Sequence, residues 1–426
     1  KVRSWPFSHS IRSGRVMLTI NWHTAGLRKI ILKTCRIDVG QLAFDYWQDH
    51  DDLHNLNDYL HTALDTPLNQ APMTEPKDVV LYGFGRIGRI LARMLIERTT
   101  LNNKLRLRAI VVRGGREGDL EKRASLLRRD SVHGPFNGSI TVDEEHSSIV
   151  ANGTRIKVIY ANKPEDIDYR DYDIDDALIV DNTGMFKDRE GLSRHLAPGA
   201  KKVLLTAPAK GDIENIVYGV NEDMILSEDK IISAASCTTN AITPVLKALN
   251  DEFGIRNGHV ETVHSYTNDQ NLIDNYHPAP RRGRSAPLNM VISTTGAAKA
   301  VAKALPELKG LLTGNAIRVP TPNVSMAIMN LNLKKATDKE ALNDYLRHIS
   351  LNSKLQNQVD YTASTEIVST DLVGSRYAGV VDSQATIVDG DRAVLYVWYD
   401  NEFGYSCQVV RVMLAMADIN VPTLPL

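Results

Sequence analysis

A glycine-rich turn between two predicted strands constrains the fold more than any other part of the chain. Residues 79–82 form a short hydrophobic run, the motif GFGRIG follows at 83–88, and a second predicted strand spans 105–112. Between the two strands, apolar residues recur at the spacing of one helix face: Ile87, Ile90, Leu91, Met94 and Leu95. The order strand, GxGxxG, helix, strand predicts a Rossmann unit that binds a dinucleotide.

Each glycine of the motif has a separate role in this prediction. Gly83 permits the tight turn, Gly85 lets the backbone approach the pyrophosphate, and Gly88 allows the helix to pack closely on the strand. The N–H groups at the start of the helix then face the phosphates. The residues between the glycines complete the predicted cofactor contact: Phe84, Arg86 and Ile87.

The end of the second predicted strand bears on the choice between NAD and NADP. A Rossmann unit that selects NAD usually places Asp or Glu there, to accept hydrogen bonds from the ribose 2′-hydroxyl. Here Arg113-Gly114-Gly115-Arg116 follows, so no carboxylate opposes a 2′-phosphate and two guanidiniums can pair with one. The sequence predicts NAD or NADP, with Arg113 and Gly114 favouring NADP or the use of both. Alternatively, both arginines are surface residues and NAD is bound with weaker ribose contacts.

A lone cysteine among small hydroxylated residues is the strongest sign of catalysis. The segment SAASCTTN (233–240) follows an apolar stretch and precedes an amphipathic one, which predicts Cys237 at the N-terminus of a helix. Exposed N–H groups and the helix dipole there favour the thiolate and depress the thiol pKa. His264 supplies a candidate base. The alternative is an inert, buried cysteine, the interpretation that we give to Cys35 and Cys407.

Bulk properties exclude several classes of protein. At 426 residues the chain exceeds one ordinary core, which predicts two domains and an appendage. A net charge of −1 gives no case for nucleic acid or an anionic membrane, and no apolar stretch approaches the roughly 18–20 residues of a membrane span. Three cysteines without paired spacing favour a reducing compartment and a cytoplasmic location. No HExxH or CxxC motif is present, so no metal site is predicted.

Hydrophobic runs predict further elements. Strands are expected at 156–160, 177–181, 202–206, 216–220, 230–233, 260–266 and 324–333, and a helix near 338–349. Leucines at three- and four-residue steps predict another helix near 51–65: Leu53, Leu56, Leu60 and Leu64. Residues 66–67 and 71–76 are typical of a linker. We interpret the segment before residue 77 as packed on its own subunit or on a neighbour, without a site of its own.

Five motifs, in this order, resemble those of the glyceraldehyde-3-phosphate dehydrogenases. They are SAASCTTN (233–240), HSYTNDQ (264–270), STTGAAKAV (293–301), RVPTPNVS (318–325) and WYDNEFGYS (398–406). The resemblance runs from about Lys77 to Ala417. It implies an α/β fold with a Rossmann dinucleotide-binding domain at 77–236, completed by a C-terminal helix at 406–420, and an α+β catalytic domain at 237–400. Residues 1–76 match nothing in the family and form a mainly helical N-terminal extension in this interpretation.

The resemblance implies the chemistry of a phosphorylating dehydrogenase. Cys237 adds to the aldehyde of glyceraldehyde 3-phosphate to form a hemithioacetal. His264 takes the hydroxyl proton as hydride leaves for the nicotinamide, and in the family it also lowers the thiol pKa. Inorganic phosphate then attacks the thioester and releases 1,3-bisphosphoglycerate, in a reversible step of glycolysis and gluconeogenesis.

Other roles follow from matching positions in the motifs. The implied cofactor contacts are Thr183, Gly184, Thr206, Asn401 and Tyr405. The implied site for the substrate phosphate comprises Thr267, Asp269 and Arg318. The implied site for the attacking phosphate comprises Ser236, Thr238, Thr295 and Gly296, with Arg282 shared or close by.

Two alternatives stay open. Erythrose-4-phosphate dehydrogenase shares the cysteine and histidine motifs, and residues 272–278 resemble it faintly, but Thr267 and residues 293–296 keep the phosphate-site pattern. A non-catalytic binding or scaffold relative is the other, and the intact Cys237, His264 and Asn401 set counts against it. The family forms homotetramers through a loop that contains residues 276–288 here. We therefore expect a homotetramer whose small-molecule partners are a phosphorylated aldehyde and inorganic phosphate.

Overall fold

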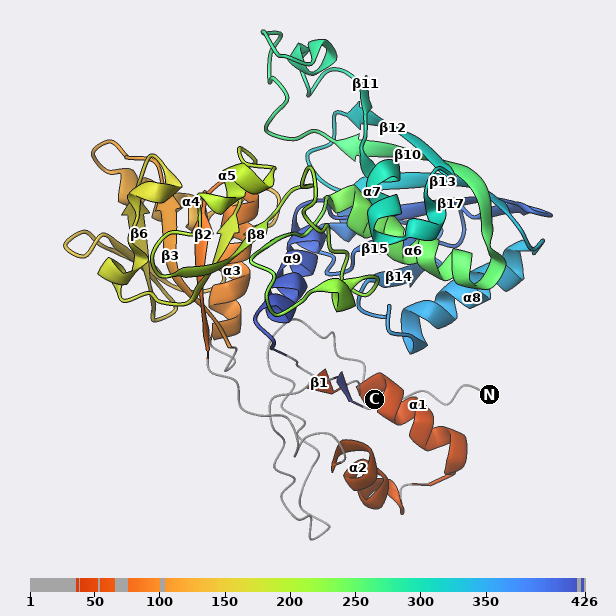
Figure 1. Cartoon of the computed structure of the whole chain (residues 1–426). Coiled ribbons are helices and arrows are strands. Elements are labelled where there is room, and N and C mark those ends of the chain that lie inside the picture. The colour runs from red at the N-terminus through yellow and green to blue at the C-terminus, as the bar shows by residue number, and fades with distance from the viewer. Residues whose placement is uncertain are drawn as a thin grey trace. The chain divides into compact units, whose positions relative to one another are not determined.

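The computed structural model describes residues 36–37, 39–52, 54–65, 76–99, 104–419 and 423–424. They belong to two compact units, one drawn from residues 1–73 and 421–426 and the other from residues 74–420. The larger unit contains two eight-stranded sheets (Figure 1). These sheets carry the site.

The smaller unit is a pair of helices and a short strand pair. Helices α1 (Val39–Asp49) and α2 (Leu56–Asp65) pack together, and β1 (Arg36–Ile37) pairs in parallel with β18 (Thr423–Leu424). Tyr46 of α1 is 1% exposed, and its ring lies 5.3 Å from that of Tyr59 on α2. The helical extension is thus confirmed for the described residues.

The helix predicted near 51–65 begins later, at Leu56, and α1 was not predicted. His54 donates its N–H to Asp52 Oδ1 at 3.0 Å, so a side-chain turn precedes α2. Helix α1 lacks the regular leucine spacing that marks α2. Its buried positions include a tyrosine, and glycine and acidic residues lie among them, so its sequence shows no clear helical pattern. Leu53 and the expected linker at 66–67 and 71–75 lie outside the described residues.

The first sheet carries the Rossmann unit. Its strand order is β4-β5-β6-β3-β2-β7-β8-β9, with parallel pairing from β6 to β9 and antiparallel pairing of β4 and β5. Parallel strands of such a sheet are buried on both faces, which explains fully buried apolar runs such as 79–82 and 177–180. The strands are β2 (Lys77–Tyr82), β3 (Leu105–Val112), β4 (Ile140–Asp143), β5 (Ser148–Ala151), β6 (Thr154–Tyr160), β7 (Ala177–Asp181), β8 (Ala200–Leu205) and β9 (Ile231–Ser233). The helices are α3 (Arg86–Thr99), α4 (Asp119–Arg128) and α5 (Arg189–Ser193).

One strand prediction in this sheet is wrong. Residues 216–220 form turns after a single bridge between Asn215 and Ser233. The Val217 N–H donates to Asn221 Oδ1 at 2.8 Å, and the Asn221 N–H donates to the Val217 carbonyl at 3.2 Å. The asparagine side chain therefore satisfies backbone groups that a strand would have paired. The other strands predicted before Cys237 are confirmed within two residues.

The second sheet has the order β11-β12-β10-β13-β17-β15-β14, and β16 pairs with β17. Apolar side chains of α6 pack against β10, β13 and β17 in one core cluster. The strands are β10 (Ile255–Ser265), β11 (Val291–Thr294), β12 (Leu312–Val319), β13 (Ser325–Leu333), β14 (Val359–Thr362), β15 (Gly379–Asp382), β16 (Ile387–Asp389) and β17 (Arg392–Tyr399). The helices are α6 (Cys237–Phe253), α7 (Ala297–Ala304) and α8 (Lys339–Asn352), so the predictions at 260–266, 324–333 and 338–349 are confirmed within a few residues.

The last helix, α9 (Phe403–Met416), returns to the first sheet. It contacts both α3 and α6 and lies between the two sheets (Figure 1). The ammonium of Lys202, a residue of β8, donates to the carbonyl of Met416 at 2.9 Å. The helix predicted at 406–420 thus begins three residues earlier and ends at Met416, because Ala417 ends the helical conformation and Asp418 has a positive φ of 53°.

Within the described ranges, each helix is too short or too polar to cross a lipid bilayer. In the same ranges no group of three or more His, Cys, Asp or Glu side chains is placed to hold a metal ion.

Candidate active site

The turn between β9 and α6 places Cys237 at the first residue of a helix. The chain leaves β9 at Ser233, reverses through Ala235 at φ 54° and enters α6 at Cys237. Ser236 is the N-cap, and its hydroxyl oxygen accepts the N–H of Thr239 at 3.1 Å. Serine is a preferred residue there because it satisfies an N–H group without a partner in the helix. The predicted position of Cys237 is confirmed.

Side chains of the same motif hold this turn. The Ser233 hydroxyl accepts the N–H of Ala235 at 3.0 Å and donates to the carbonyl of Ala207 at 2.7 Å. The Asn240 amide donates to the carbonyls of residues 234 and 236 at 2.8 and 3.0 Å. Tyr405 of α9 donates its hydroxyl to the Ala235 carbonyl at 2.9 Å. Four hydrogen bonds with three side chains therefore hold the backbone before Cys237.

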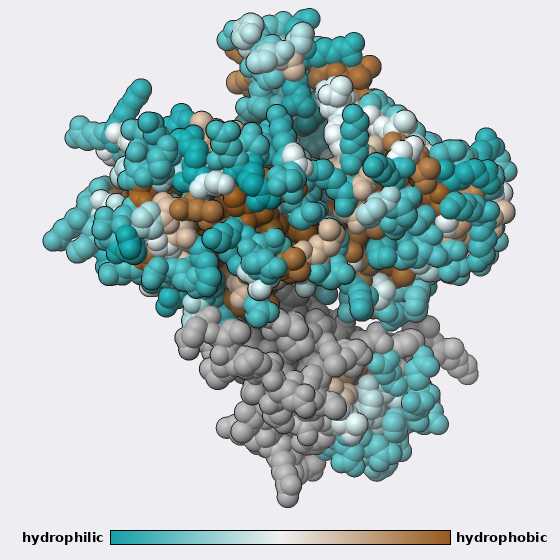
Figure 2. All heavy atoms as spheres, viewed as in Figure 1, coloured by the Kyte–Doolittle hydropathy of each residue, from teal (hydrophilic) through white to brown (hydrophobic). Residues whose placement is uncertain are grey.

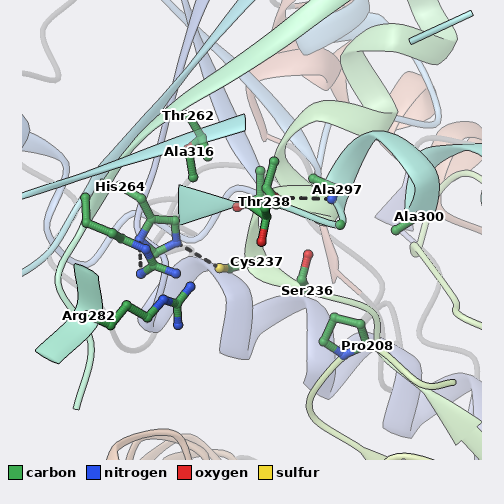
Figure 3. Close-up of a pocket in the computed structure, with 14 residues that line it drawn as sticks. Pro208, Ser236, Cys237, Thr238, Thr262, His264, Arg282, Ala297, Ala300 and Ala316 are labelled. Atoms are coloured by element: carbon green, nitrogen blue, oxygen red, sulfur yellow. Dashed lines mark hydrogen bonds between the residues drawn. The ribbon is translucent and has the colours of Figure 1, made fainter. Parts of the chain in front are cut away.

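Cys237 and His264 face each other. Cys237 Sγ lies 3.5 Å from His264 Nε2 (Figure 3). His264 Nδ1 lies 2.7 Å from the carbonyl oxygen of Ser265, and because a carbonyl only accepts, this bond assigns the ring proton to Nδ1. Arg318 Nη1 is 3.0 Å from Nδ1 and 3.2 Å from the same carbonyl, so with this tautomer it donates to the carbonyl. The lone pair of Nε2 is then free to accept the thiol proton.

Burial keeps both members of this pair uncharged. It lowers the pKa of His264 to about 3, assisted by the Arg318 guanidinium. It also raises the pKa of the Cys237 thiol, although Arg318 and hydrogen bonds from Thr238 oppose the rise. The expectation of a depressed thiol pKa is therefore wrong for this geometry. The helix N-terminus contributes as predicted, but desolvation outweighs it and His264 carries no positive charge at neutral pH.

A cavity of about 220 Å³ opens beside the Cys237 sulfur. The first turns of α6 and α7 face it, and the Arg282 side chain points toward Cys237 (Figure 3). Helix N-termini and guanidiniums both favour anions, so the cavity is suited to a phosphate. Eight of the predicted site residues line it: Ser236, Cys237, Thr238, His264, Arg282, Thr295, Gly296 and Arg318.

The other two predicted phosphate residues, Thr267 and Asp269, lie outside the cavity lining. The Thr267 hydroxyl donates to one oxygen of Asp269, and Arg282 pairs with the other. Burial opposes ionisation of Asp269, but the Thr267 hydroxyl and the Arg282 guanidinium outweigh it and lower the pKa. Arg318 Nη1 lies 3.4 Å from the Thr267 hydroxyl. In this arrangement Asp269 orients Arg282, which reaches the cavity.

Thr262 and Tyr399 are among the residues of the site that were not predicted. Thr262 lines the cavity, and Tyr399 lies 1% exposed with its hydroxyl 2.7 Å from Thr262 Oγ1 and 2.9 Å from Thr238 Oγ1. The Tyr399 ring lies edge-on to His264, with centroids 6.0 Å apart. Tyr399 belongs to the last of the five motifs and Thr262 lies two residues before His264. The two residues meet because β10, β13 and β17 are neighbours in the sheet, and this strand order cannot be read from the motifs.

The β2–α3 turn has the shape that a dinucleotide requires. Gly83 adopts φ 94°, and a Cβ on Gly88 would lie 2.4 Å from the Gly83 carbonyl oxygen. A Cβ on Gly85 would meet no atom within 4 Å, so the backbone there is open to a ligand. The N–H groups at the start of α3 suit a pyrophosphate. These residues therefore fit a dinucleotide cofactor.

Asn401 and Tyr405 follow β17 near the catalytic pair. Asn401 Oδ1 accepts the hydroxyls of Ser265 and Ser325 at 2.8 and 2.9 Å. Because the carbonyl end of the amide is held, its NH₂ group is turned the opposite way and can donate to a ligand. Tyr405 is buried and joins the turn before Cys237 through its hydroxyl. Asn401 therefore fits a contact to the nicotinamide carboxamide.

Thr183, Gly184 and Thr206 lie at the carboxyl ends of β7 and β8. The N–H and hydroxyl of Thr183 both donate to Asp181 Oδ1 at 2.7 Å. The Thr206 hydroxyl donates to the Asp181 carbonyl at 3.0 Å, and Gly184 has φ 66°. In sheets of this kind ligands bind at the carboxyl ends of the strands, so all three lie at the expected edge.

The arginines of the cofactor prediction differ in their surroundings. Arg113 and Arg116 are exposed, and Arg113 Nη2 lies 3.1 Å from the sulfur of Met185. A thioether is a weak acceptor, so this contact competes poorly with a phosphate. The Arg86 side chain is instead held by two carboxylates, Asp130 and Glu402. Only the backbone of Arg86 is then available to the pyrophosphate.

The fold and the site define the class of this protein: an oxidoreductase that uses NAD or NADP and acts on an aldehyde. Comparison with known proteins gives the family. Residues 77–189 match the glyceraldehyde 3-phosphate dehydrogenase NAD binding domain, and residues 236–401 match the C-terminal domain of the same family. The chain belongs to the glyceraldehyde-3-phosphate dehydrogenase family.

Individual relatives agree with this. The chain is 69% identical over 352 residues to a glyceraldehyde-3-phosphate dehydrogenase-like protein of Pseudomonas aeruginosa. This alignment covers 82% of this chain and 76% of the relative. It is 43% identical over 343 residues to glyceraldehyde-3-phosphate dehydrogenase 2 of a Nostoc species, covering 80% and 98%. It is 40% identical over 341 residues to glyceraldehyde-3-phosphate dehydrogenase 2 of Bacillus subtilis, covering 80% and 96%.

Proposed function

We propose that this protein oxidises glyceraldehyde 3-phosphate with inorganic phosphate and NAD(P) to 1,3-bisphosphoglycerate, reversibly, through a thioester on Cys237. The observation that carries the proposal is the 3.5 Å approach of Cys237 Sγ to His264 Nε2 at a cavity lined by Arg282 and Arg318. A hydrolytic aldehyde dehydrogenase has no need of an anion site beside its cysteine, whereas phosphorolysis requires one.

The neutral pair performs the first half of the reaction. As Cys237 Sγ bonds to the aldehyde carbon, the thiol proton passes to His264 Nε2 and then to the former carbonyl oxygen, which gives a neutral hemithioacetal. The nicotinamide cofactor, when bound, supplies the hydride acceptor. His264 Nε2 takes the hydroxyl proton as the carbon loses hydride, and a thioester remains on Cys237. Such proton transfer contributes roughly 10²–10⁴ to rates, and the low pKa keeps His264 unprotonated for it.

Phosphate completes the reaction. A phosphate oxygen attacks the thioester carbon, the carbon–sulfur bond breaks, and the sulfur leaves as thiolate and takes back the proton from His264. The acyl phosphate departs. We assign the attacking phosphate to the starts of α6 and α7 and the substrate phosphate to Arg318 with its neighbours. The residues of the first site are Ser236, Thr238, Thr295, Gly296 and Arg282, and those of the second are Arg318, Thr267 and Asp269.

Cofactor preference is a further part of the proposal. The carboxylate that selects NAD is replaced by Gly114, and Arg113 has only the Met185 sulfur as its hydrogen-bond acceptor among the contacts found in the described residues. We therefore expect NADP to be used at least as well as NAD. A cytoplasmic location stays a prediction from cysteine usage.

Assembly as a homotetramer is also proposed. The segment 271–292, which contains the 3₁₀ turn η4 (Pro280–Gly283) and leads into β11, projects from the second sheet, with hydrophobic side chains on its surface (Figures 1 and 2). Its most exposed apolar residues are 72–86% exposed: Leu272, Met290, Ile273, Leu288 and Tyr276. Surfaces of this kind mark contacts with other chains. Light scattering should give four times the chain mass, and a monomer at micromolar concentration would contradict the proposal.

An initial-rate assay tests the proposed reaction. The purified protein is supplied with glyceraldehyde 3-phosphate and either NAD or NADP, with and without inorganic phosphate. We expect turnover that depends on phosphate and that arsenate restores. Full-speed oxidation without either anion would indicate hydrolysis. Faster turnover of erythrose 4-phosphate would favour the related dehydrogenase, and no turnover of either sugar phosphate would favour a non-catalytic relative.

A further inference from the structure

Five charged or titratable side chains join the start of α3 to the turn after β17. Arg86 donates to Asp130 at 2.6 Å and to Glu402 at 2.8 Å. His133, between α4 and β4, lies in the middle, with Nε2 3.1 Å from Asp400 and Nδ1 3.7 Å from Asp130 and 3.8 Å from Glu402. The side chains of His133, Asp130 and Asp400 are 6%, 5% and 0% exposed. We call these five residues the interdomain cluster.

Asp400 of the interdomain cluster shapes the turn in which Asn401 lies. Its Oδ1 accepts the N–H groups of residues 402 and 403 at 2.9 and 2.8 Å. Its Oδ2 accepts the Gly374 N–H at 2.8 Å and faces the His133 ring. Among the bonds found in the described residues, the His133 contact is the one that reaches this carboxylate from the Rossmann part of the chain. The backbone at Asn401 therefore depends on both parts.

His133 also contacts the second segment that holds Asn401. Its Nε2 lies 3.2 Å from the amide of Asn323, which precedes Val324. Because Nε2–H donates to the Asp400 carboxylate, the amide accepts from it when flipped, with its otherwise unpartnered Oδ1 toward the ring. Val324 has φ 65°, a left-handed conformation that is strained for a β-branched residue. The next residue, Ser325, donates its hydroxyl to Asn401 Oδ1 at 2.9 Å. His133 thus contacts the residue before Asn401 and the strained turn before Ser325.

We propose that His133 is a positioning residue for the nicotinamide end of the cofactor. It holds the segments at Asp400 and Asn323 in register, so that the Asn401 NH₂ group is presented to the nicotinamide carboxamide. The pyrophosphate contacts at 83–88 and Asn401 are far apart in the chain, and the interdomain cluster links their backbones through side chains. The inference rests on the proposed function only in taking Asn401 as the nicotinamide contact.

Binding measurements without substrate test this proposal. ADP-ribose lacks the nicotinamide and therefore reports the glycine-rich end of the site alone. We expect His133→Ala to weaken NAD binding about tenfold, or roughly 1.4 kcal/mol, and to change ADP-ribose binding less than about twofold. His133→Gln keeps an N–H donor for Asp400 and should restore most of the NAD affinity. If the protein prefers NADP, the 2′-phosphorylated pair of ligands is used.

Controls separate positioning from stability. His146→Ala removes an exposed histidine that pairs with Asp143 in the same domain at 3.0 Å, and it should change neither affinity. If His133→Ala does not fold, His133→Asn, too short to reach Asp400, takes its place. Thermal unfolding of each variant shows whether it is folded at the temperature of the binding experiment.

A double-mutant cycle identifies the route of the effect. Asn401→Ala should reproduce the selective loss of NAD affinity, and adding the His133 substitution to it should cause no further loss. Equal weakening of NAD and ADP-ribose, unchanged NAD affinity in the His133 variant, or additive losses in the double variant would each overturn the proposal. Failure of the proposed reaction would appear separately, as absent turnover of glyceraldehyde 3-phosphate by the unsubstituted protein with its NAD-to-ADP-ribose affinity ratio intact.

Discussion

The β2–α3 turn and the β9–α6 turn each end a parallel strand and begin a helix, yet they use different residue types. In the first, Gly83, Gly85 and Gly88 remove side chains from the backbone. In the second, Ala235 takes a left-handed conformation without being glycine, and the hydroxyls of Ser233 and Ser236 hold the chain. A turn whose backbone must approach a dinucleotide is bare. A turn that aims one side chain is instead fixed by hydrogen bonds between its own side chains and its backbone.

The largest expected effect is on the second turn. Cys237→Ser should lower turnover roughly 10³-fold or more, because a serine hydroxyl is a far weaker acid and nucleophile than a thiol. Cofactor affinity should not change, since the glycine turn is untouched. Isothermal titration and initial rates measure the two quantities. Cys407→Ser, buried in α9, is the matched control and should retain turnover. Retained turnover by Cys237→Ser would contradict the proposed mechanism.

The pH dependence of thiol alkylation tests the charge state of the catalytic pair. With the thiol pKa raised and that of His264 near 3, Cys237 is protonated and His264 neutral between pH 6 and 8. The thiolate fraction, and with it the iodoacetamide rate, should rise about tenfold per pH unit across this range. Cys237→Ser provides the blank. A rate that levels off from pH 6 upward would show a thiolate–imidazolium pair instead.

Substitution of two glycines of the first turn should affect different properties: stability at Gly88 and cofactor binding at Gly85. Gly88→Ala brings a Cβ within 2.4 Å of the Gly83 carbonyl, so it should lower the free energy of unfolding, by roughly 1–3 kcal/mol. Gly85→Ala meets no atom within 4 Å and should leave stability unchanged, while weakening cofactor binding about tenfold. Denaturant unfolding and titration distinguish them. Unchanged cofactor affinity in the Gly85 variant would mean that this backbone does not approach the ligand.

Arg113 extends the first turn's contact to the far end of the cofactor. Its guanidinium can form charge-assisted hydrogen bonds to a 2′-phosphate, worth about 1.5–3 kcal/mol each. Arg113→Ala should therefore raise the Michaelis constant for NADP about tenfold and leave that for NAD nearly unchanged. Equal weakening of both cofactors would mean that Arg113 only packs beside the adenosine.

The smallest expected effect concerns the strain in the second turn. A left-handed residue other than glycine costs roughly 1–2 kcal/mol, and glycine loses about 0.5–1 kcal/mol more backbone entropy on folding. Ala235→Gly should thus raise the free energy of unfolding by roughly 0.5–1 kcal/mol. Ala241→Gly, inside α6, should lower it by about 1 kcal/mol. A loss of stability at position 235 as well would show that the alanine methyl is needed for packing.

Local patterns predicted most strands of the first sheet but only β10 and β13 of the second. The run 105–112 became β3 with the same bounds, because its apolar residues are the ones that the sheet buries, while Arg106 is exposed and Arg108 half-buried. Residues 216–220 look similar but turn around the Asn221 side chain. That bond depends on where the side chain lies after folding, which an apolar run does not reveal.

The residues of the site likewise fall into those that the sequence predicts and those that only the fold brings together. Cys237, Ser236 and their helix were predictable because cap and nucleophile are adjacent in sequence. Tyr399 and Thr262 meet only through strand order. The sign of the thiol pKa shift was missed because a sequence shows the helix start but not the depth of burial around the sulfur.

The return of α9 has a consequence for biosynthesis. Glu402, which pairs with Arg86, is made 316 residues later, and Lys202 donates to the carbonyl of Met416, 214 residues further on. A ribosome therefore releases the first sheet long before α9 exists. The nascent Rossmann strands must wait, with the α3 surface that will receive α9 uncovered, until residues 403–416 have been synthesised. A folding factor that shields this surface would act on the growing chain, before α9 covers it.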